Sequence, residues 1–137
     1  MSEARPLTEP RADEALDRIA WLREASEKLQ SLLHLSRGWD SYEADPPNQS
    51  AIHRAEQVLT AVNSTRYRPD RIVPSVEGGV VISFRRGDRY GDIECDNDGD
   101  VVALVSDGRG YIDAWQVASD IRAMEDAVRK IGLHVYG

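Results

Sequence analysis

The sequence has little of what small domains use for covalent stability or for entry into a membrane. It contains one cysteine, Cys95, among 137 residues, so no disulfide can form within the chain. A lone cysteine is typical of a reducing compartment, and we expect a cytoplasmic protein. No apolar run approaches the ~20 residues of a membrane-spanning helix, and residues 1–6 lack an apolar signal region. These absences predict a protein that folds without disulfides and is neither exported nor inserted into a membrane.

Motifs of the common enzyme classes are also missing. The chain has no Walker phosphate-binding loop, no dinucleotide-binding glycine pattern, no nucleophile-elbow serine and no CxxC pair. Cys95 lies in a predicted strand without a neighbouring base in sequence, which indicates a buried packing thiol and not a nucleophile. We therefore predict a protein that is not an enzyme and that uses no cofactor.

Charge is abundant and unevenly distributed. The formal charge is −7, which argues against general nucleic-acid binding because that function needs a basic surface. Acidic residues concentrate in residues 38–50 and 91–100, whereas residues 66–89 are net basic. An acidic surface keeps a protein soluble, and it also fits a basic partner. The partner that this pattern favours is another protein.

The spacing of apolar residues predicts two helices, then strands, then a helix. The expected helices cover residues 10–37, 49–63 and 114–131, and the expected strands cover residues 72–76, 80–84, 89–95 and 101–105. Gly132 is expected to end the last helix, and Pro74 suggests an edge strand. Such runs of like elements predict an α+β fold: an N-terminal helical hairpin, a three- to four-stranded antiparallel β-meander and a C-terminal helix, with the helices on one face of the sheet. Residues 1–9 are expected to be frayed and residues 10–137 to form a single domain, whose opposite sheet face would be free for a partner.

The connection between the first two helices, residues 38–47, is the organising segment of the sequence, and we call it the hinge. Gly38 suits a helix C-terminus, and Asn48 suits the N-cap of the next helix after a double proline. One interpretation is that Trp39 plugs the end of the helical hairpin. The other is a recognition surface of aromatic and acidic side chains on a well-held loop. The candidate protein-binding residues are Trp39, Asp40, Tyr42, Glu43 and Asp45.

The hinge also carries a resemblance. The run from Gly38 to Pro47, followed by Ala51, Ile52, Ala55 and a glycine-turned meander, resembles a group of small uncharacterised bacterial proteins with a Gly-Trp-Asp … Ala-x-Pro motif before a helix and a sheet. The resemblance covers roughly residues 30–105 and implies a small cytoplasmic protein of bacterial origin. It implies no activity and transfers no catalytic residue.

Two metal-binding alternatives remain open at the level of sequence. His34 ends the first predicted helix and His53 begins the second, so with Asp40 they are candidates for a metal-dependent hydrolase site. Separately, acids follow the EF-hand positions one, three, five and twelve at Asp96, Asp98, Asp100 and Asp107. The sixth position is valine instead of glycine, so a hairpin turn is the better interpretation of that segment.

The remaining features favour contacts between proteins. Arginines flank one predicted hairpin turn and suit a phosphate, an acidic partner or a solvated hairpin end. The first helix carries a serine-interrupted apolar seam, which together with an open sheet edge would permit a self-associating structural protein or homo-oligomer. The function that the sequence favours is a non-enzymatic, small acidic protein-binding module, antitoxin-like or an accessory factor encoded beside its partner in a bacterial operon.

Overall fold

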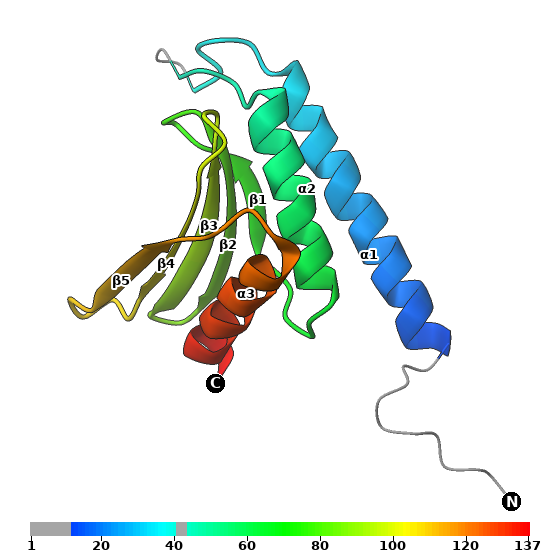
Figure 1. Cartoon of the computed structure of the whole chain (residues 1–137), viewed down its shortest axis with the longest axis vertical. Helices are drawn as coiled ribbons and strands as arrows, with labels where there is room; N and C mark the ends of the chain where they lie inside the picture. Colours follow the sequence, from blue (N-terminus) through cyan, green and yellow to red (C-terminus); the bar gives the residue numbers. More distant parts are fainter. Residues whose placement is uncertain (1–11, 41–43) are drawn as a thin grey trace, which may run out of the picture.

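The computed structural model describes residues 12–40 and 44–137, which form an α+β fold. The helices are α1 (Ala12–Ser31), α2 (Gln49–Asn63) and α3 (Ile121–Tyr136), and a short 3-10 turn, η1 (Leu32–His34), follows α1. The strands are β1 (Arg71–Pro74), β2 (Gly79–Arg86), β3 (Arg89–Asp96), β4 (Val101–Ser106) and β5 (Ile112–Gln116). Figure 1 shows α2 and α3 on one face of the sheet, with α1 lying along α2. The α+β class is confirmed, but the meander has five strands instead of three or four.

The sheet is a simple antiparallel meander in which each strand pairs with its neighbour in sequence. Side chains of alternate residues point to opposite faces, and the buried set faces α2 and α3. It includes Val80, Ile82 and Phe84 of β2 and Ile93 and Cys95 of β3, all fully buried. β1 lies at one edge, as its proline predicted, and β5 lies at the other. The core therefore lies mainly between one sheet face and α2 and α3, and Ala25, Leu29 and Leu32 of α1 and η1 add to it.

The two core helices begin at capping side chains. The Asn48 carboxamide oxygen accepts from the Ala51 N–H at 2.9 Å, and the Asp120 carboxylate accepts from the Ala123 N–H at 2.9 Å. Both bonds satisfy amides of the first helical turn that have no partner inside the helix. The Asn48 cap confirms the expected start of α2.

Helix α1 is attached more loosely, because only Ala25 and Leu29 are buried within it. Leu16 is 66% exposed and Ile19 57% exposed. The predicted apolar seam therefore packs on the domain only in its second half. Within the described residues, no helix has both the length and the apolarity needed to cross a membrane.

The helix expected over residues 114–131 is wrong at both ends. Residues Ile112–Gln116 form β5, and α3 starts only after the Asp120 cap. At the other end Gly132 does not stop the helix, which continues to Tyr136. A Cβ on Gly132 would lie 2.4 Å from the Tyr67 ring. This glycine therefore makes room for an aromatic ring instead of ending a helix.

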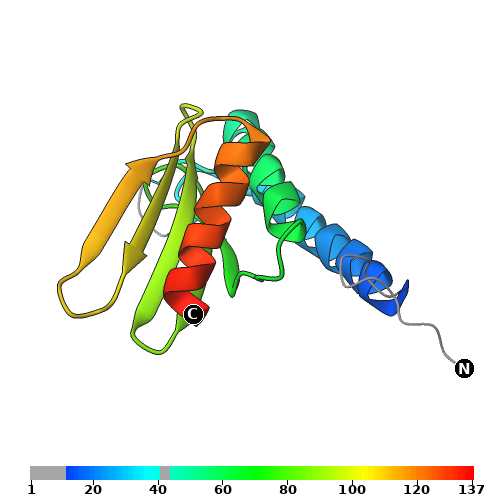
Figure 2. The same ribbon diagram turned by 60° about the horizontal axis from the view of Figure 1, so that its bottom comes forward.

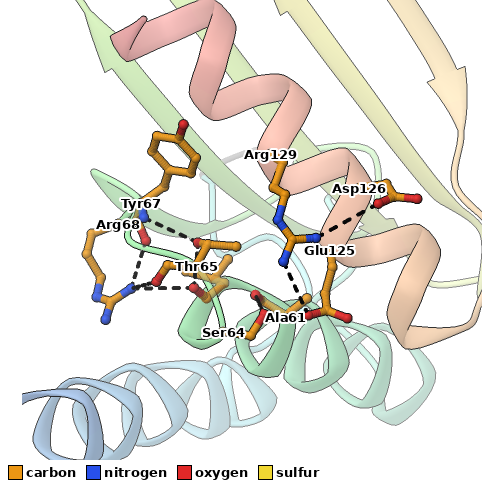
Figure 3. A network of polar contacts seen from close by, with 9 residues as sticks. Ala61, Ser64, Thr65, Tyr67, Arg68, Glu125, Asp126 and Arg129 are labelled. Atoms are coloured by element: carbon orange, nitrogen blue, oxygen red, sulfur yellow. Dashed lines mark hydrogen bonds and ion pairs between the residues drawn. The ribbon is translucent and has the colours of Figure 1, made fainter. Parts of the chain in front are cut away.

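Polar contacts fasten the segment after α2 to its surroundings (Figure 3). The Ser64 hydroxyl lies 2.6 Å from the Glu125 carboxylate of α3, and Arg129 forms an ion pair with Glu125 at 3.8 Å. The Arg68 guanidinium donates to the Thr65 carbonyl at 3.1 Å and lies 4.6 Å from the Trp21 ring centroid of α1. This connection therefore joins all three helices at one end of the domain.

Candidate functional site

The hinge is held by bonds within its own loop. Gly38 has a φ of 80°, in the left-handed region that glycine tolerates, and its N–H donates to the Ala44 carbonyl at 3.0 Å. The Trp39 indole N–H donates to the Asp45 carbonyl at 3.3 Å, and the Asp40 carboxylate accepts from the Ala44 N–H at 3.3 Å. Trp39 is half-buried and is not part of the core cluster. It therefore closes its loop instead of plugging the core.

The other hinge candidates divide between surface and undescribed positions. Asp45 is exposed and lies 3.9 Å from the Arg37 guanidinium. Tyr42 and Glu43 lie outside the described residues. The protein-binding role of the hinge stays a prediction.

Two asparagines tie the hinge to the turn between β3 and β4. The Asn97 side chain accepts from the Asn48 N–H at 2.9 Å and donates to the Pro46 carbonyl at 3.1 Å, and the Asn48 side chain donates to the Asn97 carbonyl at 2.8 Å. The paired residues lie 49 positions apart, so no local sequence pattern reveals them. They place the hinge beside the acidic hairpin turn at one end of the sheet.

That turn does not build a calcium loop. Asp96, Asp98 and Asp100 surround the β3–β4 hairpin, whereas Asp107 follows the far end of β4. The six residues of β4 separate them by roughly 20 Å, at about 3.3 Å per residue. The Asp107 carboxylate instead accepts from the Arg109 and Tyr111 amides, at 2.8 and 3.1 Å. The EF-hand pattern is therefore wrong, and the hairpin-turn interpretation is confirmed.

The histidine site does not assemble either. His34 lies in η1 and His53 in α2, and both are exposed. Across residues 12–40 and 44–137, no group of three or more His, Cys, Asp or Glu side chains is placed to hold a metal ion. Cys95 is fully buried, and burial raises the pKa of its thiol to about 12. The geometry therefore supports neither the predicted hydrolase site at His34, His53 and Asp40 nor a nucleophilic cysteine.

Two arginines near the β2–β3 turn contact the end of α3. Arg86 and Arg89 donate to the carbonyls of Tyr136 and His134, at 3.4 and 3.0 Å, where the end of α3 carries partial negative charge. They line a cavity of about 630 Å³ that also contains Asp88 and Asp107. The positive charge of these arginines is already balanced by the carbonyls at the end of α3 and by the two nearby carboxylates. This arrangement favours a structural role over capture of a phosphate.

The sheet face turned away from α2 and α3, which we call the open face, was expected to be free, but its residues were not among the sequence-predicted site residues. Its central strand, β3, presents Tyr90, Asp92, Glu94 and Asp96 there, because the alternating residues Gly91, Ile93 and Cys95 face the helices. Figure 2 shows both helices on the other side of the sheet. Asp92 and Glu94 fall in the strand expected over residues 89–95, whereas Asp96 was assigned to the hairpin turn. The open face therefore carries a row of carboxylates on its middle strand.

Aliphatic side chains flank these carboxylates. Strand register places Glu94 between Val81 of β2 and Val102 of β4, and it places Asp92 between Ser83 and Leu104. Asp92 and Glu94 are consequently half-buried although α2 and α3 lie on the other face of the sheet. Burial raises the pKa of the Asp92 carboxyl, because a low-dielectric environment disfavours the charged form. Each carboxylate is therefore a charged group in a partly apolar setting.

Hydrogen bonds fix the orientation of the row. The Tyr90 hydroxyl donates to Asp92 at 2.6 Å, and the Ser75 hydroxyl donates to Glu94 at 2.7 Å. The Arg85 guanidinium lies 4.9 Å from the Tyr90 ring centroid. Burial, followed by the bond to Asp92, raises the pKa of the Tyr90 phenol. The carboxylates are thus held in place before any ligand arrives, which lowers the entropic cost of binding.

Asp96 gives this site a measurable pH dependence. Partial burial and the neighbouring Glu94 and Asp98 raise the pKa of its carboxyl from 3.8 to about 6. The folded chain therefore binds this proton more tightly than the unfolded chain does. Ionisation opposes folding, so the contribution of Asp96 to the free energy of unfolding falls as pH rises from about 4 to about 6.

We predict that Asp96→Asn is more stable than the wild type at pH 7 and loses this advantage at pH 4. Thermal melting followed by circular dichroism at both pH values measures the difference. Asp17→Asn, which removes the same charge from the exposed surface of α1, is the control. A difference in melting temperature between Asp96→Asn and the wild type that is equal at both pH values would contradict the assignment.

Comparison with protein-family models, with curated protein sequences and with solved structures finds no match to this chain. The resemblance to small bacterial proteins therefore stays a prediction. The geometry of the open face and the hinge is the basis for a proposed function.

Proposed function

We propose that the chain is a non-enzymatic protein-binding module whose open face receives a basic segment of a partner protein. The observation that carries the proposal is a pair of half-buried carboxylates on the sheet face that α2 and α3 leave uncovered: Glu94 lies between two valines, and Asp92 lies beside Leu104. A lysine or arginine side chain matches this surface, because its aliphatic stem packs on apolar groups while its charged end reaches a carboxylate.

The hinge borders the same surface. Asp96 ends β3, and the next residue, Asn97, binds Pro46 and Asn48. Trp39 and Asp45 lie in the loop that these bonds hold. A partner on the open face would therefore reach the hinge at the acidic end of β3. This arrangement supports the hinge as a second contact region for an antitoxin-like or accessory factor with a basic partner, in the cytoplasm.

The proposal predicts that the double variant Asp92→Asn/Glu94→Gln binds its partner at least tenfold more weakly, a loss of about 1.4 kcal/mol. The partner is first captured from an extract of the source cells, identified, and purified for isothermal titration calorimetry. The substitutions preserve shape and most hydrogen-bonding capacity, so circular dichroism should show an intact fold. Asp13→Asn/Glu14→Gln, which removes the same two charges from the exposed start of α1, is the matched control.

The contribution of the hinge is measured in the same assay with Trp39→Ala. Because Trp39 lies outside the core cluster, we expect the fold to survive this change while binding weakens. Absence of a stoichiometric partner, or unchanged affinity in the Asp92→Asn/Glu94→Gln variant, would refute the assignment to the open face. Loss of binding in the control variant would point to nonspecific attraction by net charge.

A further inference from the structure

The outer edge of β5 carries unpaired backbone groups. β5 is the last strand of the sheet and pairs only with β4. Figures 1 and 2 both show β5 at the border of the sheet, with no helix beside its outer edge. An uncovered edge strand offers a row of N–H and C=O groups to any second strand.

Three residues supply these groups. The Val117 N–H donates to Val101, and the Asp107 N–H donates to Tyr111, so the odd-numbered residues from 111 to 117 point their backbone groups at β4. Hydrogen-bonded and non-bonded pairs alternate along an antiparallel ladder. Ile112, Ala114 and Gln116 therefore point their N–H and C=O groups outward.

The other edge of the sheet is better protected. β1 has four residues and ends at Pro74, which has no N–H to donate. A groove beside it is lined by both β1 and α1 residues, including Ile72 and Trp21, so α1 lies next to this edge. β5 has no proline and no lysine, and its pairing with β4 shows no bulge. The charge that β5 does carry, on Asp113, is bonded to Lys130 of α3 at 3.0 Å, so proline, lysine and a bulge are the edge-protecting devices that this strand lacks.

The β5 sequence also permits a symmetric pairing without like charges opposite each other. In an antiparallel pair centred on Ala114, Ile112 of one copy faces Gln116 of the other, and Asp113 faces Trp115. No like charges meet, whereas centring on Asp113 would place two carboxylates opposite each other. Ile112, which is 65% exposed, would gain a neighbouring side chain across the pair. The Ala114-centred register uses all the outward groups of the strand and forms about six hydrogen bonds.

We propose that β5 pairs with β5 of a second copy of this chain, antiparallel and centred on Ala114, so that two five-stranded sheets join into one across a twofold axis. Both copies contribute the same residues, as twofold symmetry requires. The open faces of the two copies then lie on the same side of the joined sheet. The pairing is independent of the proposed partner binding, because it uses backbone groups of β5 and not the carboxylates of β3.

Site-directed cross-linking tests the register. Two Ala114 residues would have Cα atoms about 5.5 Å apart, whereas two Gln116 residues would be roughly 14 Å apart because each lies two positions from the centre. We expect a short bifunctional maleimide to link Ala114→Cys into dimers at least tenfold faster than Gln116→Cys. Cys95 is buried, so the wild type should remain unlinked. Equal rates at the two positions would overturn the proposed register.

Light scattering across a range of concentrations tests the dimer itself. Ala114→Pro removes an N–H that makes no bond to β4, so the monomer should keep its fold by circular dichroism while the dimer dissociation constant rises at least tenfold. Ala114→Ser is the control and should dimerise like the wild type. A wild type that is monomeric at every concentration would overturn the proposal. A dimer that persists in Ala114→Pro would also overturn the proposal. It would indicate that the two copies meet at another surface, for example at the exposed Leu16 and Ile19 of α1.

Discussion

Gly132→Ala is expected to lower the free energy of unfolding by about 1–3 kcal/mol, the usual cost of an extra group in a packed site. A destabilisation would be informative, because helix propensity alone favours alanine over glycine by about 1 kcal/mol and would therefore make this variant more stable. The added Cβ would lie 2.4 Å from two carbons of the Tyr67 ring and 2.6 Å from a third. That ring stacks on Tyr136, with centroids 6.0 Å apart, so it cannot move without disturbing a second aromatic side chain. Urea denaturation measures the loss.

A double-mutant cycle with Tyr67→Ala isolates the cause. The three atoms nearest to the added methyl group all belong to the Tyr67 ring, so without that ring Gly132→Ala should stabilise the helix by up to ~1 kcal/mol. A reversal of sign between the two backgrounds identifies the steric contact. If Gly132→Ala destabilises both backgrounds equally, Gly132 has a different role.

Asn97→Ala is the second change with a large expected effect. It removes the bond from the Asn48 N–H at 2.9 Å and the bond to the Pro46 carbonyl at 3.1 Å. Each is worth about 0.5–1.5 kcal/mol, so we expect a loss of about 1–3 kcal/mol in the free energy of unfolding. Hydrogen exchange at the Asn48 amide should accelerate as well, because this amide would lose its bond to the Asn97 side chain.

Gln49→Ala is the matched control for Asn97→Ala. It removes an exposed amide side chain beside the same junction and should change stability by less than about 0.5 kcal/mol. Asn97→Asp should give an intermediate result, because it retains the acceptor for Asn48 and loses the donor for Pro46. Should Asn97→Ala leave both stability and exchange unchanged, the hinge would be held by its internal bonds alone.

The structural features that could be predicted are those set by residues adjacent in the sequence. The Asn48 cap, the α2 boundaries and the Pro74 edge strand follow from signals within a few positions, and the structure confirms each of them. The start of α3 was misplaced although its cap, Asp120, is equally local. Residues 112–116 combine three apolar residues with Asp113 and Gln116, and their pairing partner, β4, is what makes them a strand.

The candidate site was only half visible for the same reason. The sequence shows that acidic residues cluster in residues 91–100. It does not show which face of β3 the helices cover, and that decides whether Asp92 and Glu94 are left on an uncovered face. A free sheet face was expected, but the side chains beside Asp92 and Glu94 come from β2 and β4. Cross-strand register decides these contacts, and no motif within one strand contains it.

By itself the sequence determined the α+β class and the Asn48 cap of α2, because helix caps are set by adjacent residues. Gly38 has the positive φ that was expected of it, but the first helix ends at Ser31 instead of Arg37. Only the tertiary structure decided what Trp39, Gly132 and the β3 carboxylates do. Trp39 closes a loop, Gly132 admits the Tyr67 ring, and Asp92 and Glu94 lie on an uncovered sheet face. Each of these roles depends on groups brought into contact by folding, and burial and shape complementarity exist only once those groups meet.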